Sequence, residues 1–181
     1  MSLEKISAQL SMQGNKQGNK LPPVEEWDPP YCGEMDLQIK ANGDWFYAGS
    51  IFKRVSLVKL LASVLKKEAD NYFLVTPVEK IGISVEDAPF VLTQWHWQDD
   101  NKTTMVITNN VGDEFTLDAT HPITLNDAGE LYVTVRRNLL AKVHRNVYYQ
   151  WIDLAKEVNT DKGTELMFTS ADVQFSLGVI S

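Results

Sequence analysis

The sequence contains very little cysteine. Cys32 is the single cysteine among 181 residues, so no disulfide bond can form within the chain. Long apolar runs are also absent, and no segment approaches the roughly 20 residues that a membrane-spanning helix needs. The first residues lack the apolar core of a signal peptide. We therefore expect a soluble, cytoplasmic protein that does not bind a membrane.

An excess of basic residues is missing as well. The formal net charge is −7, whereas a general nucleic-acid binder needs a basic surface that releases counterions from phosphates. The densest basic group, formed by Arg136, Arg137, Lys142 and Arg145, is spaced rather than continuous. We interpret it as a solvated face and expect no nucleic-acid partner.

Recognisable catalytic motifs are absent too. The chain has no Walker A loop, no GxGxxG, no GxSxG and no HExxH. Its three histidines, His96, His121 and His144, lie far apart in sequence. We expect no cofactor and no bound metal. A metal site built in three dimensions from His121 with Asp113 and Asp118 stays open, beside a purely local structural role for His121.

The first 22 residues are polar and include the near-repeat of residues 13–16 and 17–20. Ile6 and Leu10 could form one weak helical turn. A segment with so few apolar residues buries too little surface to offset its ordering entropy, so we predict a mobile tail over residues 1–22.

The rest of the chain, with 44% hydrophobic residues overall, shows two kinds of apolar pattern. Alternating apolar residues predict strands at residues 37–41, 45–47, 72–75, 81–85, 91–97, 105–108 and 114–117. Apolar residues at helical spacing predict helices at residues 55–67 and 147–158, the second with Asn146 as N-cap. Residues 137–144 are expected to form a hairpin arm, with a short helix as the alternative.

Two parts of the chain resemble each other. The segment from Leu37 to Phe46 matches that from Ile123 to Tyr132: two alternating apolar residues precede a glycine–acid turn and an aromatic strand. A predicted helix, a strand, a break centred on threonine and a second strand follow in both. The sequence therefore predicts an α+β fold of two tandem similar motifs, each a β-hairpin, a helix and two strands, with an additional hairpin between them. Residues 23–90 would form the first α+β repeat and residues 91–181 a second, β-rich repeat packed on the first.

The stretch between the repeats, residues 74–90, carries the best candidate site. The residues that we expect to bind a ligand there are Thr76, Glu79, Lys80, Glu86 and Asp87. Paired carboxylates can act as acid and base, and a mixed pair such as Glu79 and Lys80 can hold a polar ligand. The alternatives are loop solvation and capping for Glu86 and Asp87, a surface ion pair for Glu79 and Lys80, and a structural hinge for the whole stretch.

Three further residues are second choices for the site. Arg54 and Arg136, together with Lys80, could hold an anion, and His121 could serve as a base. The aromatic residues Trp95 and Trp97 flank His96 and could instead mark a subunit interface.

Several blocks of sequence are similar to one known family. They are Arg54, residues 57–65, Tyr72, Leu74-Val75-Thr76-Pro77-Val78-Glu79-Lys80 and Val85-Glu86-Asp87-Ala88-Pro89-Phe90, followed by Gly112-Asp113, Asp118, His121-Pro122, Val135-Arg136 and Val147-Tyr148-Tyr149. From about residue 27 to the C-terminus, the chain resembles the bacterial family known as domain of unknown function 1285. It departs at Gly49-Ser50-Ile51, where the family pattern has a proline. The resemblance implies an α+β fold with repeated motifs, no assigned activity, and a role that leans towards ligand binding in signalling.

The leading functional hypothesis is a non-enzymatic module that binds a small molecule or a protein partner. It follows from a polar loop between two repeats and from the lack of a catalytic motif. The alternative is a hydrolase or isomerase that uses Glu79 or His121 as general base, with or without a divalent metal. The sequence fixes neither the ligand nor the oligomeric state.

Overall fold

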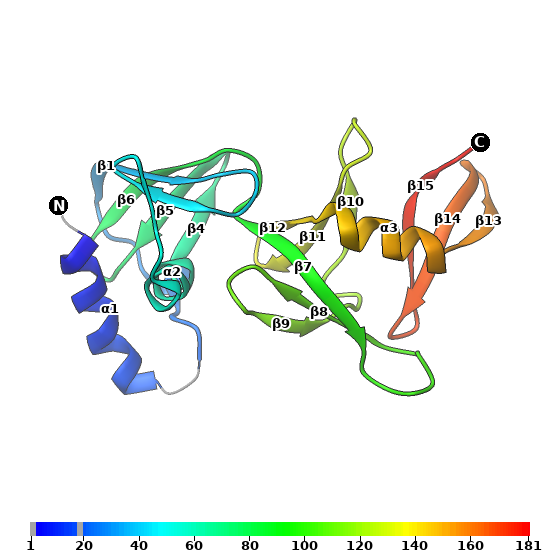
Figure 1. The fold of residues 1–181 in the computed structure, drawn as a ribbon. Coiled ribbons are helices and arrows are strands. Elements are labelled where there is room, and N and C mark those ends of the chain that lie inside the picture. The colour runs from blue at the N-terminus through cyan, green and yellow to red at the C-terminus, as the bar shows by residue number, and fades with distance from the viewer. Residues whose placement is uncertain (1–2, 18–19) are drawn as a thin grey trace. The chain divides into compact units, whose positions relative to one another are not determined.

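A computed structural model describes residues 3–17 and 20–181 of the protein (Figure 1). The chain divides into two compact units, Met1–Asp87 and Ala88–Ser181. Both units contain helices and strands, which agrees with the expected mixed α+β class. Among the described residues, no helix is both long and apolar enough to cross a membrane.

The first unit is built on one six-stranded sheet. Its elements in chain order are α1 (Leu3–Gln17), a 3-10 turn (Val24–Glu26), β1 (Tyr31–Ile39), β2 (Trp45–Tyr47), β3 (Ser50–Ile51), α2 (Val55–Ala62), β4 (Leu65–Glu68), β5 (Asn71–Val75) and β6 (Lys80–Val85). The strand order is β3-β2-β1-β6-β5-β4. Two antiparallel three-stranded groups, β1–β3 and β4–β6, are joined by the parallel pair β1 and β6.

The hairpin between β1 and β2 confirms the turn expected from Asn42-Gly43-Asp44. The Asn42 side-chain oxygen accepts from the backbone N–H of Asp44 at 3.0 Å, and Gly43 has φ +93°. Glycine adopts this left-handed conformation without steric cost, which is why the chain reverses here.

One face of this sheet forms the core of the first unit. Its buried apolar residues include Leu37, Ile39, Trp45, Leu65, Leu74, Ile81 and Ile83. The helices add buried side chains of their own, from Ile6 and Leu10 of α1 and from Leu61 of α2. In Figure 1, α1 and α2 lie below the strands of this sheet. The opposite face of the sheet carries charged side chains, among them Lys66, Glu68 and Lys80.

The N-terminal segment differs from the mobile tail that the sequence predicted. Residues 3–17 form α1, and Leu3, Ile6 and Leu10 are buried. These three residues recur at intervals of three and four, so they share one helix face, and their burial against the unit offsets the entropy of ordering the helix. Residues 1, 2, 18 and 19 of the expected tail lie outside the described residues.

The first predicted helix ends earlier than expected. Helix α2 stops at Ala62, and Leu65–Glu68 forms β4 instead of a last helical turn. Strand β4 pairs antiparallel with β5, with Lys66 opposite Phe73. The pairing supplies backbone hydrogen bonds and buries Leu65, which outweighs the helical spacing of the apolar residues. Three strands therefore follow this helix, not two.

The second unit contains two sheets and one helix. Its elements are β7 (Phe90–Trp97), β8 (Met105–Asn109), β9 (Glu114–Thr116), β10 (Ile123–Leu125), β11 (Leu131–Arg136), β12 (Leu139–Val143), α3 (Arg145–Leu154), β13 (Lys156–Thr160), β14 (Gly163–Ser170) and β15 (Val173–Val179). The six-stranded sheet has the order β10-β11-β12-β7-β8-β9, with β12 and β7 parallel. Strands β13, β14 and β15 form a separate antiparallel sheet.

Three sequence expectations for this unit can be compared with the structure. The arm at residues 137–144 is strand β12, so the alternative of a short helix there is wrong. The second helix ends at Leu154, because the next residues pair with β14 as β13. Its N-cap is His144, not Asn146: the His144 ring nitrogen Nδ1 accepts from the Asn146 backbone N–H at 3.1 Å.

The core of the second unit is centred on Trp151 of α3. Trp151 is fully buried, and its ring lies 5.1 Å from that of Phe168 on β14. A buried serine links the two sheets: the Ser170 hydroxyl donates to the Leu117 carbonyl at 2.7 Å and accepts from the Met105 N–H at 2.8 Å.

Candidate functional site

Thr76 shapes the turn between β5 and β6 and is not open to a ligand. Only 1% of it is exposed. Its hydroxyl oxygen accepts from the backbone N–H of Glu79 at 3.0 Å and of Val78 at 3.3 Å, and its own N–H donates to the Glu79 carbonyl at 2.8 Å. Thr76 therefore fixes where the next strand begins.

Glu79 lies on the helix side of this turn. It is 8% exposed, and its Oε1 atom is 3.3 Å from Nζ of Lys5 on α1. Its other oxygen, Oε2, is buried without a hydrogen-bond partner among the described residues. A buried carboxylate oxygen without a donor is unusual, because the desolvation of the charge is then uncompensated.

Lys80 is the next residue along the chain and faces the other side of the sheet. Its ammonium lies 4.5 Å from the centre of the Phe73 ring and donates a hydrogen bond to Glu68. Glu68 also lies 3.4 Å from Nζ of Lys66. The hydrogen bond from Lys80, helped by the charges of both lysines, lowers the pKa of Glu68 below its usual value.

The remaining residues of the predicted central site lie elsewhere in the first unit. Glu86 follows the far end of β6, is exposed, and pairs with Lys40 at 3.8 Å. Asp87 is half-buried beside it, and Arg54 is exposed where α2 begins. A strand rises about 3.3 Å per residue, so Glu86 lies roughly 20 Å from Lys80. The structure does not gather the five residues into one cluster.

His121 and Arg136 lie in the second unit, and both are held by neighbours there. The Nδ1 atom of His121 is 2.9 Å from the Thr134 carbonyl, and its ring lies 4.4 Å from that of Phe115. The Arg136 guanidinium donates to Asp113 at 3.0 Å and lies 5.1 Å from the Phe90 ring. Within the described ranges, 3–17 and 20–181, no three potential metal ligands come together.

The outer face of the first sheet has a hollow that the sequence did not predict. It has a volume of about 270 Å³ and lies over β1, β5 and β6. Its lining includes Tyr31, Glu34, Phe73 and Lys80. The Tyr31 hydroxyl donates to Oε1 of Glu34, and the rings of Tyr31 and Phe73 meet edge to face at 6.1 Å. The hydrogen bond to Glu34 raises the pKa of Tyr31.

Gly82 forms the floor beneath Glu34. The two residues are opposite each other in the parallel pair of β1 and β6. A Cβ atom at Gly82 would overlap the carboxyl group of Glu34. The missing side chain therefore lets the Glu34 carboxylate lie flat on the sheet, inside the hollow.

A bulge in β1 explains why sequence reasoning missed this hollow. In a regular strand, Tyr31 and Glu34 would point to opposite faces, because their separation is odd. The pairing with β6 places Tyr31 opposite Lys80 but Glu34 opposite Gly82, so β1 has one residue more than β6 between these positions. Gly33, with φ +99°, accommodates this extra residue. In the sequence, Gly33 after the proline pair was the feature that could have indicated this bulge.

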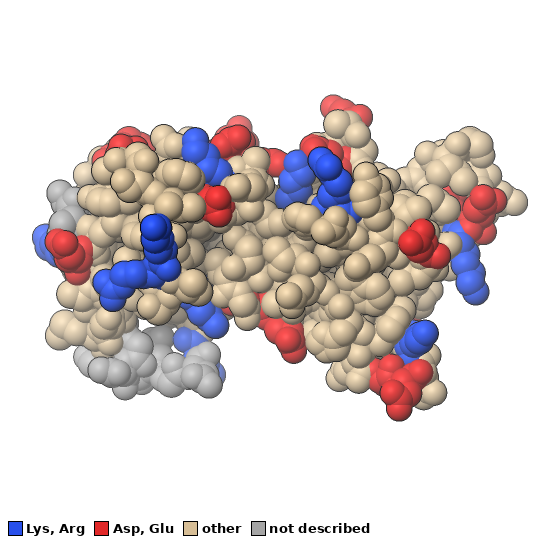
Figure 2. All heavy atoms as spheres, viewed as in Figure 1, with Lys and Arg blue, Asp and Glu red and all other residues tan. Residues whose placement is uncertain are grey.

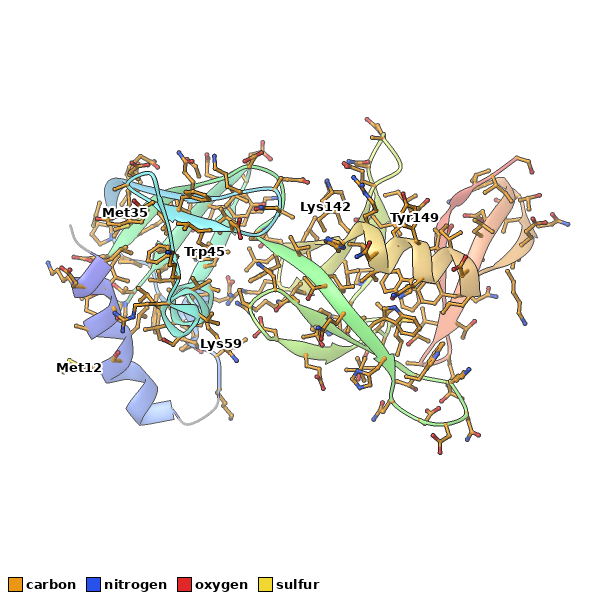
Figure 3. The ribbon with its side chains drawn as sticks, viewed as in Figure 1. Met12, Met35, Trp45, Lys59, Lys142 and Tyr149 are labelled. Atoms are coloured by element: carbon orange, nitrogen blue, oxygen red, sulfur yellow. The ribbon has the colours of Figure 1, made fainter. Side chains whose placement is uncertain are left out.

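A second hollow lies in the second unit. It has a volume of about 400 Å³, and its lining includes Glu130, Lys142, Arg145 and Tyr148. Lys142, labelled in Figure 3, lies 2.8 Å from Glu130, and this contact lowers the pKa of Glu130. Of the two basic side chains in this lining, Lys142 is thus already neutralised by Glu130.

Charged side chains of both signs alternate over the face seen in Figure 2. The blue and red residues of the described chain are interspersed, and the basic ones do not merge into one continuous surface on this face. An extended anionic polymer would find no basic track there.

Comparisons with known proteins agree on one family. The model for "Domain of unknown function (DUF1285), N-terminal domain" matches residues 22–88, and that for "Protein of unknown function (DUF1285), C-terminal domain" matches residues 89–177. A DUF1285 family protein from Silicibacter pomeroyi DSS-3 has a similar crystal structure, with a TM-score of 0.79, 31% identity and coverage of 94% of this chain and 95% of that one. A DUF1285 family protein from Shewanella baltica OS155 matches with a TM-score of 0.54, 30% identity and coverage of 65% and 90%. No curated protein matches the chain.

Proposed function

We propose that this chain, which belongs to the DUF1285 family, is a non-enzymatic binding module and that its ligand is a small polar molecule. The ligand would occupy the hollow on the outer face of the first sheet. One observation carries this proposal: the hollow presents a carboxylate, Glu34, and an ammonium, Lys80, together with the aromatic rings of Tyr31 and Phe73. Such a module could report a metabolite to a protein partner, which would be a role in signalling.

The chemistry of the lining suits binding better than catalysis. A tyrosine hydroxyl is protonated at neutral pH, and the hydrogen bond to Glu34 raises the pKa of Tyr31 further, so the hydroxyl donates a hydrogen bond and is not a nucleophile. The Lys80 ammonium is bonded to Glu68 and lies on the Phe73 ring, so it offers a fixed positive charge. Groups that are already oriented in this way recognise a ligand at low entropic cost.

Of the five residues expected to form the central site, Lys80 is the one that contacts the ligand in this proposal. Thr76 and Glu79 act indirectly, because their turn sets the start of β6 and so the position of Lys80. We assign no contact with this ligand to Glu86, Asp87, Arg54, His121 or Arg136.

A general-base enzyme is the second candidate function, and the unpartnered Oε2 of Glu79 favours it. In this alternative Glu79 would accept a proton after α1 and its Lys5 had moved away. His121 is less suited, since one ring nitrogen is already engaged with the Thr134 carbonyl. A turnover screen of wild type against Glu79→Gln tests the alternative: activity that Glu79→Gln abolishes would support it.

We also propose that the chain arose by internal duplication. The order of three strands, a helix and three strands occurs in β1–β6 with α2 and again in β10–β15 with α3, with β7–β9 between them. Asparagine side chains shape the first turn in both, Asn42 before Asp44 and Asn126 before Glu130. Lys80 has no counterpart in the second copy, where the chain passes from Asp172 directly to Val173. The proposed site therefore belongs to the first unit.

A thermal-shift screen of the full chain tests the proposed function. The panel would contain amino acids, amines, carboxylates, sugars and nucleotides, measured against wild type and Gly82→Ala. A ligand at a hundredfold its dissociation constant stabilises the folded state by about 2.7 kcal/mol. For a chain of this size, each kcal/mol raises the melting temperature by roughly 2–4 °C. We expect a hit that Gly82→Ala loses, because a methyl group there displaces Glu34.

The control for this screen is Lys59→Met, which removes an exposed lysine of α2 that is labelled in Figure 3 and does not line the hollow. It should bind as wild type does. A hit that persists unchanged in Gly82→Ala would contradict the proposed placement of the ligand.

A further inference from the structure

We infer that the ligand of the outer-face hollow is a zwitterion of the α-amino-acid type, with a free ammonium and a free carboxylate group. The inference rests on the proposed function and adds the chemical class of the ligand. Glu34 would receive the ammonium, Lys80 the carboxylate, and the rings of Tyr31 and Phe73 the apolar side chain.

Glu34 is the position for a cation. Its carboxylate accepts from the Tyr31 hydroxyl but lies within 4.0 Å of no lysine or arginine nitrogen in the described part of the chain. It is nevertheless held in place, because it rests on Gly82 and is bonded to Tyr31. A carboxylate that is oriented but lacks a counter-ion binds an ammonium through charge-assisted hydrogen bonds.

Lys80 can serve an anion without leaving its present partner uncompensated. Glu68 accepts from Lys80 but also lies 3.4 Å from Nζ of Lys66. If Lys80 donated one of its three N–H groups to a ligand carboxylate, Lys66 would still neutralise Glu68. Lys80 therefore offers a donor to the hollow at little electrostatic cost.

The separation of the two charges selects a ligand that carries both. Glu34 and Lys80 line the same hollow but form no ion pair with each other. One molecule with an ammonium and a carboxylate can bridge that gap. The hollow, at about 270 Å³, is smaller than the 300–1,000 Å³ of typical drug-sized pockets, which fits a single amino acid or a similar metabolite.

Other ligand classes fit the lining less well. A phosphate would face the negative charge of Glu34 and find only Lys80 as a cationic lining residue. A divalent metal prefers several oxygen ligands, and Glu34 is the only carboxylate of the lining. A simple amine would leave Lys80 without a new partner, and a simple acid would leave Glu34 without one.

Isothermal titration of the full chain with matched sets of three ligands tests the inference. Each set holds an α-amino acid, the amine that lacks its carboxylate and the acid that lacks its amino group, such as phenylalanine, 2-phenylethylamine and 3-phenylpropionate. We expect the zwitterion to bind about ten- to hundredfold more tightly than either analogue, because each lost charge removes one charge-assisted contact.

Two substitutions separate the two ends of the ligand. Glu34→Gln should abolish the preference for the amino acid over the acid, and Lys80→Met should abolish its preference over the amine. Lys59→Met, the exposed control, should keep both preferences. Unchanged melting curves for the variants show that lost binding is not lost folding.

The inference is overturned if no amino acid binds, or if an amino acid binds no better than its two analogues. A separate outcome would contradict the proposed function. A different small molecule that binds wild type but not Gly82→Ala would overturn the zwitterion and leave the binding module standing. A ligand that binds Glu34→Gln, Lys80→Met and Gly82→Ala as tightly as wild type would contradict both.

Discussion

Two glycines determine the proposed site at the scale of single residues. Gly33 accommodates the extra residue of β1, so that Tyr31 and Glu34 reach the same face, and Gly82 leaves room for the Glu34 carboxylate. Neither residue contacts a ligand through a side chain, because glycine has none. Their roles depend on backbone conformation and on which strands are neighbours.

Ser170→Ala should destabilise the second unit. The substitution leaves the Met105 N–H and the Leu117 carbonyl without their shared partner inside the protein. An unpaired buried polar group costs about 1–3 kcal/mol, so chemical denaturation should show a loss of that size. Ser84→Ala, at an exposed strand position, is the control and should change stability by less than about 0.5 kcal/mol. Equal effects of the two substitutions would contradict the bridging role of Ser170.

Glu68 should make the first unit less stable in acid. Its pKa is lowered in the folded state by the hydrogen bond from Lys80, relative to a usual value of 4.5. The stabilisation is therefore fully present above about pH 4.5 and is lost as the pH falls through the lower folded-state value. Glu68→Gln should cost less than about 1 kcal/mol at pH 7, because Glu68 is 40% exposed at its side chain.

Denaturation of wild type and Glu68→Gln between pH 7 and pH 3 checks this dependence. The difference between the two should disappear at the acid end of the range. A difference that is constant over the whole range would show that the ion pairs of Glu68 do not contribute.

At this scale the turns were predictable from the sequence: the break centred on Thr76 and the glycine–acid turn at Asn42 and Gly43 are both present. The sequence placed Thr76, Glu79, Lys80, Glu86 and Asp87 together, because they are close along the chain. The structure separates them: Glu79 lies in the turn and contacts Lys5 of α1, Lys80 begins β6 and faces the other side of the sheet, and Glu86 follows the far end of β6. The association of Tyr31 with Glu34 on one face escaped prediction, because it depends on a single-residue bulge.

At the scale of elements, helix α1 shows how tertiary contacts override local composition. Its sequence is polar, but Leu3, Ile6 and Leu10 fall on one face and are buried. Helix α2 shows the converse: its helical spacing continues past Ala62, but strand pairing of β4 with β5 ends the helix. Both differences depend on partners that are distant in sequence, which periodicity does not contain.

Ile6→Ala should loosen α1. Ile6 is fully buried, and truncation of such a side chain costs about 2–5 kcal/mol. The backbone amides of α1 should then exchange with solvent faster, as hydrogen-exchange mass spectrometry measures. Met12→Ala is the matched control, because Met12 lies on the same helix and is 73% exposed (Figure 3). If both variants left the exchange of α1 amides unchanged, the helix would not be held by its buried face.

At the scale of the whole molecule, the two compact units lead to a prediction about folding. The first unit has one sheet, the second has two, and each unit has its own buried core, so residues 1–87 and residues 88–181 should each fold when produced alone. Each fragment should show a cooperative thermal transition and strand-rich circular dichroism. A fragment without a cooperative transition would show that its core is incomplete.

The mixed α+β class and the family were predictable from the sequence, because they rest on periodicity and on specific blocks such as Thr76 to Lys80 and Glu86 to Phe90. The order of the strands in the sheets could not be predicted from the sequence. The parallel pairs β1 with β6 and β7 with β12 join strands that are separated by many residues, and no local signal specifies such a partner. The outer-face hollow depends on the first of these pairs.

The central claim is that a small ligand occupies the hollow between Glu34 and Lys80. Its most direct test is amide NMR of the full chain during addition of an α-amino acid, on wild type and on Gly82→Ala. The account predicts wild-type shifts concentrated at Tyr31, Glu34, Phe73, Lys80 and Gly82, and no such shifts in the variant. Shifts confined to other residues, or unchanged in Gly82→Ala, would contradict it.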